Sequence, residues 1–362
     1  MTSSEHTIWK TLLALLVATS LIGAVVGAAV YFALSTREAL PASEQDSNVV
    51  DGDEEVRTDA PLFISTMTHM EGRFTDDVDQ DVFNEHVTDL RYAMDLYDEY
   101  GAKMTVESEQ SFAKANTTWG LNFLQEIIDR GHGVGTHADF GAQSAIPLGK
   151  YVMRFAENKA LIDALVGEEN NRGVSGGFGP GDWVTAASRA GFDYMDGVTG
   201  FAYLSMPESE RPSGWTEDYI RTTAYHDPIP PDLNERIYFF DLENSSNLTP
   251  DEKGVLTISG GELGEIQSLG EGRSNCVPNC TFDESDIDVI IDSIEQAIAN
   301  RDTSRVAKIN MHIPPSVFVE ENEELLRAFF EAVAIYVERG ELQWTTQLEA
   351  YEYYEDWENI SH

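Results

Sequence analysis

Short apolar runs alternate with stretches of helical periodicity along most of the chain. The apolar runs predict strands at 62–70, 103–106, 133–135, 237–242, 255–259, 306–312 and 342–345. Apolar positions spaced three and four residues apart predict helices at 87–100, 120–130, 182–190, 287–300 and 321–338. Strands that alternate with helices in this way indicate a parallel α/β sheet or barrel. The long segments 203–235 and 243–285 are rich in Gly, Pro, Ser and Asn, and we expect them to form functional loops over one face.

The N-terminal part of the chain has a different pattern. Residues 11–34 contain no charged side chain, and this run is long enough to cross about 30 Å of hydrocarbon. It predicts a transmembrane anchor rather than a cleaved signal peptide, because the apolar core of a signal peptide is shorter. Residues 1–10 would then form a cytoplasmic tail, 35–60 an acidic linker without periodicity, and 61–362 one folded domain.

The net charge of the chain restricts the kinds of molecule that it can bind. The chain has 64 Asp and Glu residues against 23 Lys and Arg residues, which gives a formal net charge of -41. Because so negative a surface repels nucleic acid, we expect no nucleic-acid partner. Dense counterions screen such self-repulsion, so the composition favours a protein from a salt-rich environment; an acidic protein with a cationic partner is the alternative. The sequence does not indicate an oligomeric state.

Two features predict where the domain lies. Cys276 and Cys280 are four residues apart in a loop, a spacing that permits a disulfide, whereas a metal site would need two further ligands. Asn-x-Ser/Thr triplets, the acceptor sites of N-glycosylation, begin at positions 116, 244, 247, 279 and 359. Both features favour an extracellular domain on a single-pass membrane anchor.

Residues 101–141 contain a series of motifs that is known from one enzyme family. The segment reads GAKMTVESEQSFAKANTTWGLNFLQEIIDRGHGVGTHADFG. It resembles the polysaccharide deacetylase (NodB-like carbohydrate esterase) family, in which a strand Gly-x-x-x-Thr-Phe and a helix precede Arg-Gly-His-Glu-Ile-Gly-x-His. Later segments resemble the family in the same order, at 177–181, 190–194, 309–312 and 336–348. The resemblance covers residues 61–355, and it implies a distorted (β/α)7 barrel that removes N- or O-acetyl groups from a polysaccharide with a divalent metal.

The chain departs from the family's pattern at the catalytic and metal-ligand positions. The family's first motif ends in Asp-Asp, a general base followed by a metal ligand; here Met70 stands at the base position and Glu71 at the ligand position. Gly141 replaces the second His of the second motif, and Phe178 replaces an Arg of the third. His312 matches the last His motif but lacks the Asp that often follows it. These substitutions indicate either a divergent enzyme or a fold that has lost its chemistry.

The side chains that remain predict a metal site at the strand ends. Residues i and i+2 of a strand face the same side, so His69 points the same way as Glu71, and His137 the same way as Asp139. The carboxyl ends of parallel barrel strands converge on one face, which would bring these pairs together. Imidazole and carboxylate form a suitable ligand set for zinc or a similar ion, which would activate water and polarise an acetyl carbonyl.

Two further residues are candidates for catalysis. His312 ends a predicted strand on the same face and would protonate the leaving group, and Asp241 would orient it. Each candidate also has an ordinary structural explanation. A His at a strand end, such as His69, is commonly just a hydrogen-bonded polar residue, and Asp139 suits the cap of a helix equally well.

Two functions therefore stay open. The first is a metal-dependent deacetylase or related hydrolase that acts on a cell-surface or extracellular polysaccharide. The second is a non-catalytic glycan-binding or structural envelope protein that keeps the barrel. The His-x-Glu and His-x-Asp pairs favour the first, and the missing Asp base and second His favour the second.

Overall fold

The structure of the chain, a computed structural model, divides into two units, Met1–Arg57 and Thr58–His362. It describes residues of the second unit, namely 59–71, 74–138, 146–176, 183–196, 208–210, 213–222, 237–240, 256–259, 266–268, 282–301, 303–304 and 306–361. The predicted membrane anchor at 11–34 and the Cys276–Cys280 pair lie outside these residues, so both stay predictions. Within the described residues, none of the helices combines the length and the apolar character that crossing a membrane requires.

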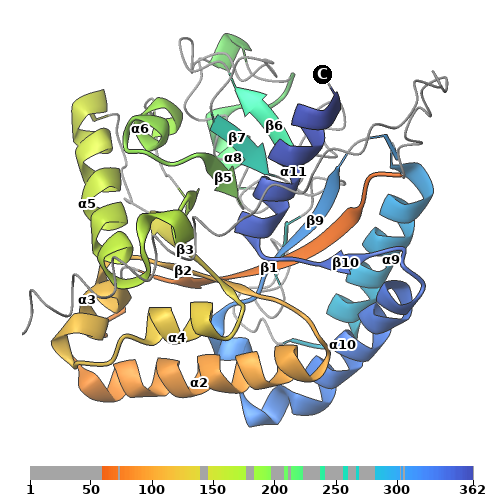
Figure 1. Cartoon of the computed structure of the whole chain (residues 1–362), viewed down its shortest axis with the longest axis horizontal. Helices are drawn as coiled ribbons and strands as arrows, with labels where there is room; N and C mark the ends of the chain where they lie inside the picture. Colours follow the sequence, from red (N-terminus) through yellow and green to blue (C-terminus); the bar gives the residue numbers. More distant parts are fainter. Residues whose placement is uncertain are drawn as a thin grey trace, which may run out of the picture. The chain divides into compact units, whose positions relative to one another are not determined.

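The described strands form one curved sheet with helices packed around it (Figure 1). Its strands are β1 Leu62–Met70, β2 Thr105–Ser108, β3 Gly133–Ala138, β4 Gly173–Gly176, β5 Tyr194–Asp196, β6 Ile237–Phe240, β7 Leu256–Ser259, β8 Ile266–Ser268, β9 Ala307–His312 and β10 Gln343–Trp344. They are ordered β6-β7-β5-β4-β3-β2-β1-β9-β8, and β10 pairs with β1. Among the described pairs, β6 with β7 is antiparallel and the others are parallel, which confirms the predicted parallel α/β class.

Helices alternate with strands along most of the described chain, with two helices between β2 and β3. The helices are α2 Gln80–Glu99, α3 Gln110–Thr118, α4 Phe123–Asp129, α5 Leu148–Val166, α6 Trp183–Arg189, α8 Glu217–Thr222, α9 Glu284–Asn300, α10 Glu323–Glu338 and α11 Gln347–Ser361. Helix α2 begins earlier than predicted because the Asp79 side chain caps it, accepting a hydrogen bond from the Asp81 amide at 3.1 Å. The helix predicted at 120–130 is wrong in its bounds, since Asn122 caps a shorter helix there.

The periodicity of the strands divides the sheet into two faces. On β1, the even-numbered Leu62, Ile64 and Met70 belong to a core of buried apolar side chains that also includes residues of α2 and α10. Thr66 faces the same way, and its hydroxyl lies 2.8 Å from that of Tyr97 on α2. Alternation therefore sends the even-numbered residues of β1 towards the helices and the odd-numbered residues into the interior of the curved sheet.

The interior is lined by buried polar side chains from several strands. They are Ser65, His69, Glu107, His137, Ser175, Asp196, Lys308, Asn310 and His312. At the start of β1, Phe63 packs instead with apolar residues of α11, including Tyr354 and Trp357. Helix α11 thereby covers the amino-terminal end of the interior, where Lys308 reaches Gln347, and the imidazoles lie towards the carboxyl ends of the strands.

Candidate metal centre

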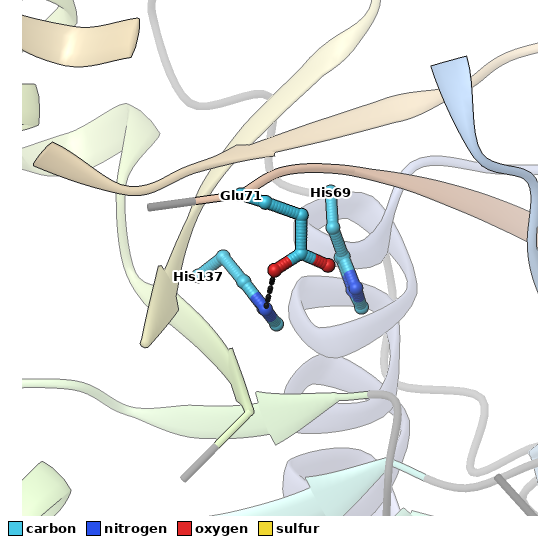
Figure 2. Close-up of side chains that lie close together, drawn as sticks. All are labelled: His69, Glu71 and His137. Carbon is cyan, nitrogen blue, oxygen red and sulfur yellow. Dashed lines mark ion pairs between the residues drawn. The ribbon is translucent and has the colours of Figure 1, made fainter. Parts of the chain in front are cut away.

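Three of the predicted ligands converge at the carboxyl ends of β1 and β3. His69, Glu71 and His137 each offer one ligand atom, and these atoms all lie within 4.8 Å of one another. Figure 2 shows the carboxylate of Glu71 pointing towards the two imidazole rings, with its Oε2 3.9 Å from Nε2 of His137. Both histidines are buried, whereas Glu71 is partly exposed. The cluster thus meets solvent through its carboxylate.

A third imidazole lies against the same cluster. The ring of His69 stacks on that of His137, with centroids 3.9 Å apart, and on that of His312, with centroids 4.3 Å apart. His312 is the last residue of β9, which pairs with β1 so that His312 is opposite Met67. The structure therefore places the predicted catalytic His beside the predicted ligands.

Two residues that the sequence did not single out complete the surroundings. Ser175 on β4 lies between two of the imidazoles, its Oγ 2.8 Å from Nδ1 of His137 and 3.3 Å from Nε2 of His69. Glu107 on β2 is fully buried, and its Oε2 lies 3.0 Å from the same Nε2 of His69. The one available signal was a glutamate at an inward position of a short apolar strand, and it was missed because that strand was predicted to end at 106.

The interior charges belong to one network beneath the histidines. Burial raises the pKa of Glu107 to about 7, while hydrogen bonds from Asp196 and Ser175 and the charge of Lys308 oppose the rise. Burial and the neighbouring Glu107 raise the pKa of Asp196 well above its usual range. Burial lowers the pKa of Lys308 to about 8 against the pull of both carboxylates, and its Nζ donates to Gln347 Oε1 at 2.5 Å. Lys308, Glu107 and Asp196 thus form one buried network, in which burial favours the neutral form of each group and the opposite charges favour the ionised forms.

Glycines in β3 and β4 make room for these side chains. Glu107 pairs in register with Gly135, where an added Cβ would lie 3.2 Å from Cγ of Glu107. At Gly173 an added Cβ would lie 2.2 Å from Cζ of Tyr194, so the tyrosine ring occupies the space above that glycine. Each of the two strands therefore has a glycine where a large side chain of the neighbouring strand fills the interior.

The remaining sequence-based candidates separate into two groups. Met70, at the family's base position, is buried in the apolar core outside the sheet, so it does not line the interior where the histidines lie. Asp139, Asp241, Gly141 and Phe178 lie outside the described residues, and the roles suggested for them stay predictions.

Comparisons with known proteins define the class of fold. No family model matches the sequence, and no curated protein matches it either. Among solved structures, the chain is similar to a putative polysaccharide deacetylase from Mycobacterium smegmatis, with a TM-score of 0.52 and 10% identity over 88% of this chain and 94% of that one. It is also similar to Puue allantoinase, with a TM-score of 0.50 and 11% identity over 80% and 89% of the two chains. The chain has the fold of the polysaccharide deacetylases, and the resemblance seen in the sequence is confirmed at the level of the fold.

The donor set fits a divalent metal. Two imidazoles and one carboxylate are ligands that zinc and similar ions accept. Burial lowers the pKa of His69 to about 3, so its ring is neutral at ordinary pH, the form that binds a metal. The exposure of Glu71 leaves one side of the cluster open, as a site that admits water and substrate requires.

Proposed function

We propose that this domain is a divergent member of the polysaccharide deacetylase family, a metal-dependent deacetylase or related hydrolase. The observation that carries the proposal is the convergence of His69, Glu71 and His137 to within 4.8 Å at the strand ends. These three residues would hold a divalent ion, zinc or one similar to it, with Asp139 as a further ligand. Here His69 takes the place of the family's second His, which Gly141 replaces.

The chemistry follows from the positions of the side chains. A bound divalent ion would supply an activated water and polarise an acetyl carbonyl. His312, stacked on His69, would give a proton to the leaving amine or alkoxide, and Asp241 would orient it.

The substrate and the location are part of the same proposal. The similar M. smegmatis protein is a putative polysaccharide deacetylase, so we propose a polysaccharide substrate for this chain too. The uncharged run at 11–34 would anchor the domain to the cell membrane and hold it outside the cell. A net charge of -41 would suit a halophilic source.

A non-catalytic glycan-binding or structural role is the second candidate, and Met70 favours it. The side chain at the family's base position is buried in the apolar core, where it cannot accept a proton from water. A hydrolase would then depend on another base near the metal, whereas a binding protein would need none.

Metal content and acetate release test the proposal together. The full-length chain is expected to bind one zinc ion per molecule and to release acetate from acetylated xylan or chitin oligosaccharides. Glu71→Gln and His137→Ala should each abolish stoichiometric binding, because a site with so few protein ligands cannot lose one. His312→Ala should keep the metal and lose acetate release.

Glu126→Gln serves as the matched control for Glu71→Gln. Glu126 is a partly exposed carboxylate on α4, paired with Arg91 at 2.6 Å, and its loss should leave metal content unchanged. Metal without acetate release from any glycan tested would favour the non-catalytic role. A wild-type chain that binds no divalent ion would overturn the proposal.

A further inference from the structure

Ser175 is a buried hydroxyl near the carboxyl end of β4 that contacts two of the clustered imidazoles. β4 pairs with β3 so that Ser175 is opposite His137, and both side chains are buried. Oγ of Ser175 forms a hydrogen bond of 2.8 Å with Nδ1 of His137 and a longer one of 3.3 Å with Nε2 of His69. The shorter bond joins the hydroxyl to the His137 nitrogen that is bonded to Cγ.

The other nitrogen of the His137 ring faces the carboxylate of the cluster. Its Nε2 lies 3.9 Å from Oε2 of Glu71 (Figure 2). A ring nitrogen and a carboxylate oxygen that bind the same zinc ion lie roughly 3–4 Å apart. The orientation of the ring therefore presents Nε2 to the place where an ion would be shared with Glu71.

Gly176, the last residue of β4, leaves room for the same ring. It has a φ of +82°, and an added Cβ would lie 3.1 Å from Cε1 of His137. The ring of His69 stacks on that of His137 with centroids 3.9 Å apart. The end of β4 thus contacts the His137 ring at Nδ1 and Cε1 and leaves Nε2 to Glu71.

Packing alone does not distinguish two orientations of this ring. A half-turn about the Cβ–Cγ bond leaves the outline of an imidazole nearly unchanged but exchanges Nδ1 with Cδ2 and Nε2 with Cε1. In the rotated ring of His137, a carbon atom would face Glu71 and could not bind an ion. The hydroxyl of Ser175 favours the observed orientation, because it pairs with a nitrogen and not with Cδ2, and a buried nitrogen without a partner is costly.

We propose that Ser175 is a positioning residue that sets the orientation of the His137 ring and so turns Nε2 towards a divalent ion shared with Glu71. A hydroxyl can donate to Nδ1 or accept from it, so the orientation is favoured in either tautomer. When Nε2 binds an ion, the ring proton is on Nδ1 and Ser175 accepts it, as outer partners of ligating histidines do. The inference rests on the proposed function for the ion, whereas the ring orientation of the metal-free chain can be measured separately.

The first measurement is the orientation of the His137 ring in the full-length, metal-free chain, deuterated except at histidine and glycine. A nuclear Overhauser effect (NOE) is expected between Hε1 of His137 and Hα of Gly176, with the ring signal assigned by its loss in His137→Gln. Ser175→Ala should weaken this NOE, because the half-turn replaces Cε1 by Nε2 beside the glycine. Ser175→Thr keeps the hydroxyl and should retain the NOE.

The second measurement is titration with Co²⁺ alone, followed by its visible absorption. Loss of the partner of a ligating His typically lowers metal affinity about 10- to 100-fold, and we expect this loss in Ser175→Ala. Ser175→Thr should restore most of the affinity. Ser65→Ala is the matched control, because Ser65 is also buried in the interior but its Oγ donates to Oδ1 of Asn310 at 3.1 Å. This control should leave both the NOE and the Co²⁺ affinity unchanged.

The outcomes separate the two proposals. A wild-type chain without the Hε1–Gly176 NOE would overturn the positioning role, and so would an unchanged NOE in Ser175→Ala. An equal loss of Co²⁺ affinity in Ser65→Ala would also count against it, since any deletion in the interior would then have the same effect. An NOE that depends on Ser175, in a wild-type chain that binds no Co²⁺, would support the positioning of the ring and refute the metal-dependent function. Should Ser175→Ala fail to fold, Ser175→Val replaces it, because valine has the shape of threonine without the hydroxyl.

Discussion

The two faces of β1 have different surroundings although they belong to the same nine residues, Leu62–Met70. The outer face carries Leu62, Ile64 and Met70 into the apolar core under the helices. The inner face carries Ser65 and His69, which reach polar partners on other strands, at 3.1 Å from Ser65 to Asn310 and 3.0 Å from His69 to Glu107. One strand therefore contributes to stability on one side and positions the candidate site on the other.

The difference shows where a barrel of this kind tolerates polar residues. Both faces of β1 are buried. Ser65 and His69 on the inner face lie against polar side chains of neighbouring strands, whereas Thr66 on the outer face lies against Tyr97 of a helix, among apolar side chains. A substitution on the outer face should therefore lower stability mainly through lost apolar packing. A substitution on the inner face should lower it mainly through lost polar partners. Four predictions follow this contrast from the largest expected effect to the smallest.

Met70→Asp tests the outer face at the family's base position. An unpaired carboxyl in the apolar core loses the packing of Met70 and must be desolvated, so the free energy of unfolding should fall by more than about 5 kcal/mol, as measured by urea denaturation. Met70→Leu should cost less than about 1.5 kcal/mol. A stable Met70→Asp chain with increased acetate release would mean that position 70 reaches the site after all.

Lys308→Met tests the inner face. The ammonium group compensates Glu107 and Asp196, and removing one partner of a buried charge network typically costs about 3–5 kcal/mol. The free energy of unfolding of the variant, measured by urea denaturation, should fall by this amount. Lys103→Met, which breaks a pair with Glu349 at the surface, should change stability by at most about 1 kcal/mol. Equal effects of the two substitutions would contradict a charge network in the interior.

Metal binding should stabilise the folded chain only when the proposed ligands are intact. At a free Zn²⁺ concentration about 100 times the dissociation constant, linkage predicts about 2.7 kcal/mol of added stability. Thermal unfolding with and without a chelator should reveal this difference in the wild-type chain and in Glu126→Gln. The same comparison in Glu71→Gln should reveal none, and a chelator-sensitive Glu71→Gln chain would remove Glu71 from the ligands.

The pH dependence of stability should report the buried ammonium group. The pKa of Lys308 is lowered from 10.5 to about 8 in the folded chain, so between these values the unfolded chain holds the proton and the folded chain does not. The free energy of unfolding contributed by Lys308 therefore rises with pH across this window, with a slope of at most about 1.4 kcal/mol per pH unit. The measurement is the difference between wild type and Lys308→Met at several pH values in the window, because tyrosine titration is common to both chains. A difference that stays flat would mean that the folded pKa of Lys308 is not lowered.

Local pattern predicted the bounds of β1. The strand at 62–70 has the predicted bounds, because a strand buried on both faces carries apolar residues at both odd and even positions. β4 and α5 were not predicted. β4 is only four residues long and begins and ends with glycine, and α5 follows a segment with no clear start signal. A glycine that makes room for a neighbour's side chain weakens the strand pattern in its own sequence.

The sequence by itself determined the parallel α/β class, the pairing of His69 with Glu71 on one side of a strand, and the place of His137 at the end of another. A period of two is a local property, and the carboxyl ends of parallel strands meet on one face regardless of detail. Only the tertiary structure decided that Met70 lies in the outer core, that three imidazoles stack, and that Glu107, Asp196 and Lys308 share one buried network. These contacts join strands far apart in the chain. A charged residue within a short strand has the same local pattern whether it faces solvent or the interior of a barrel.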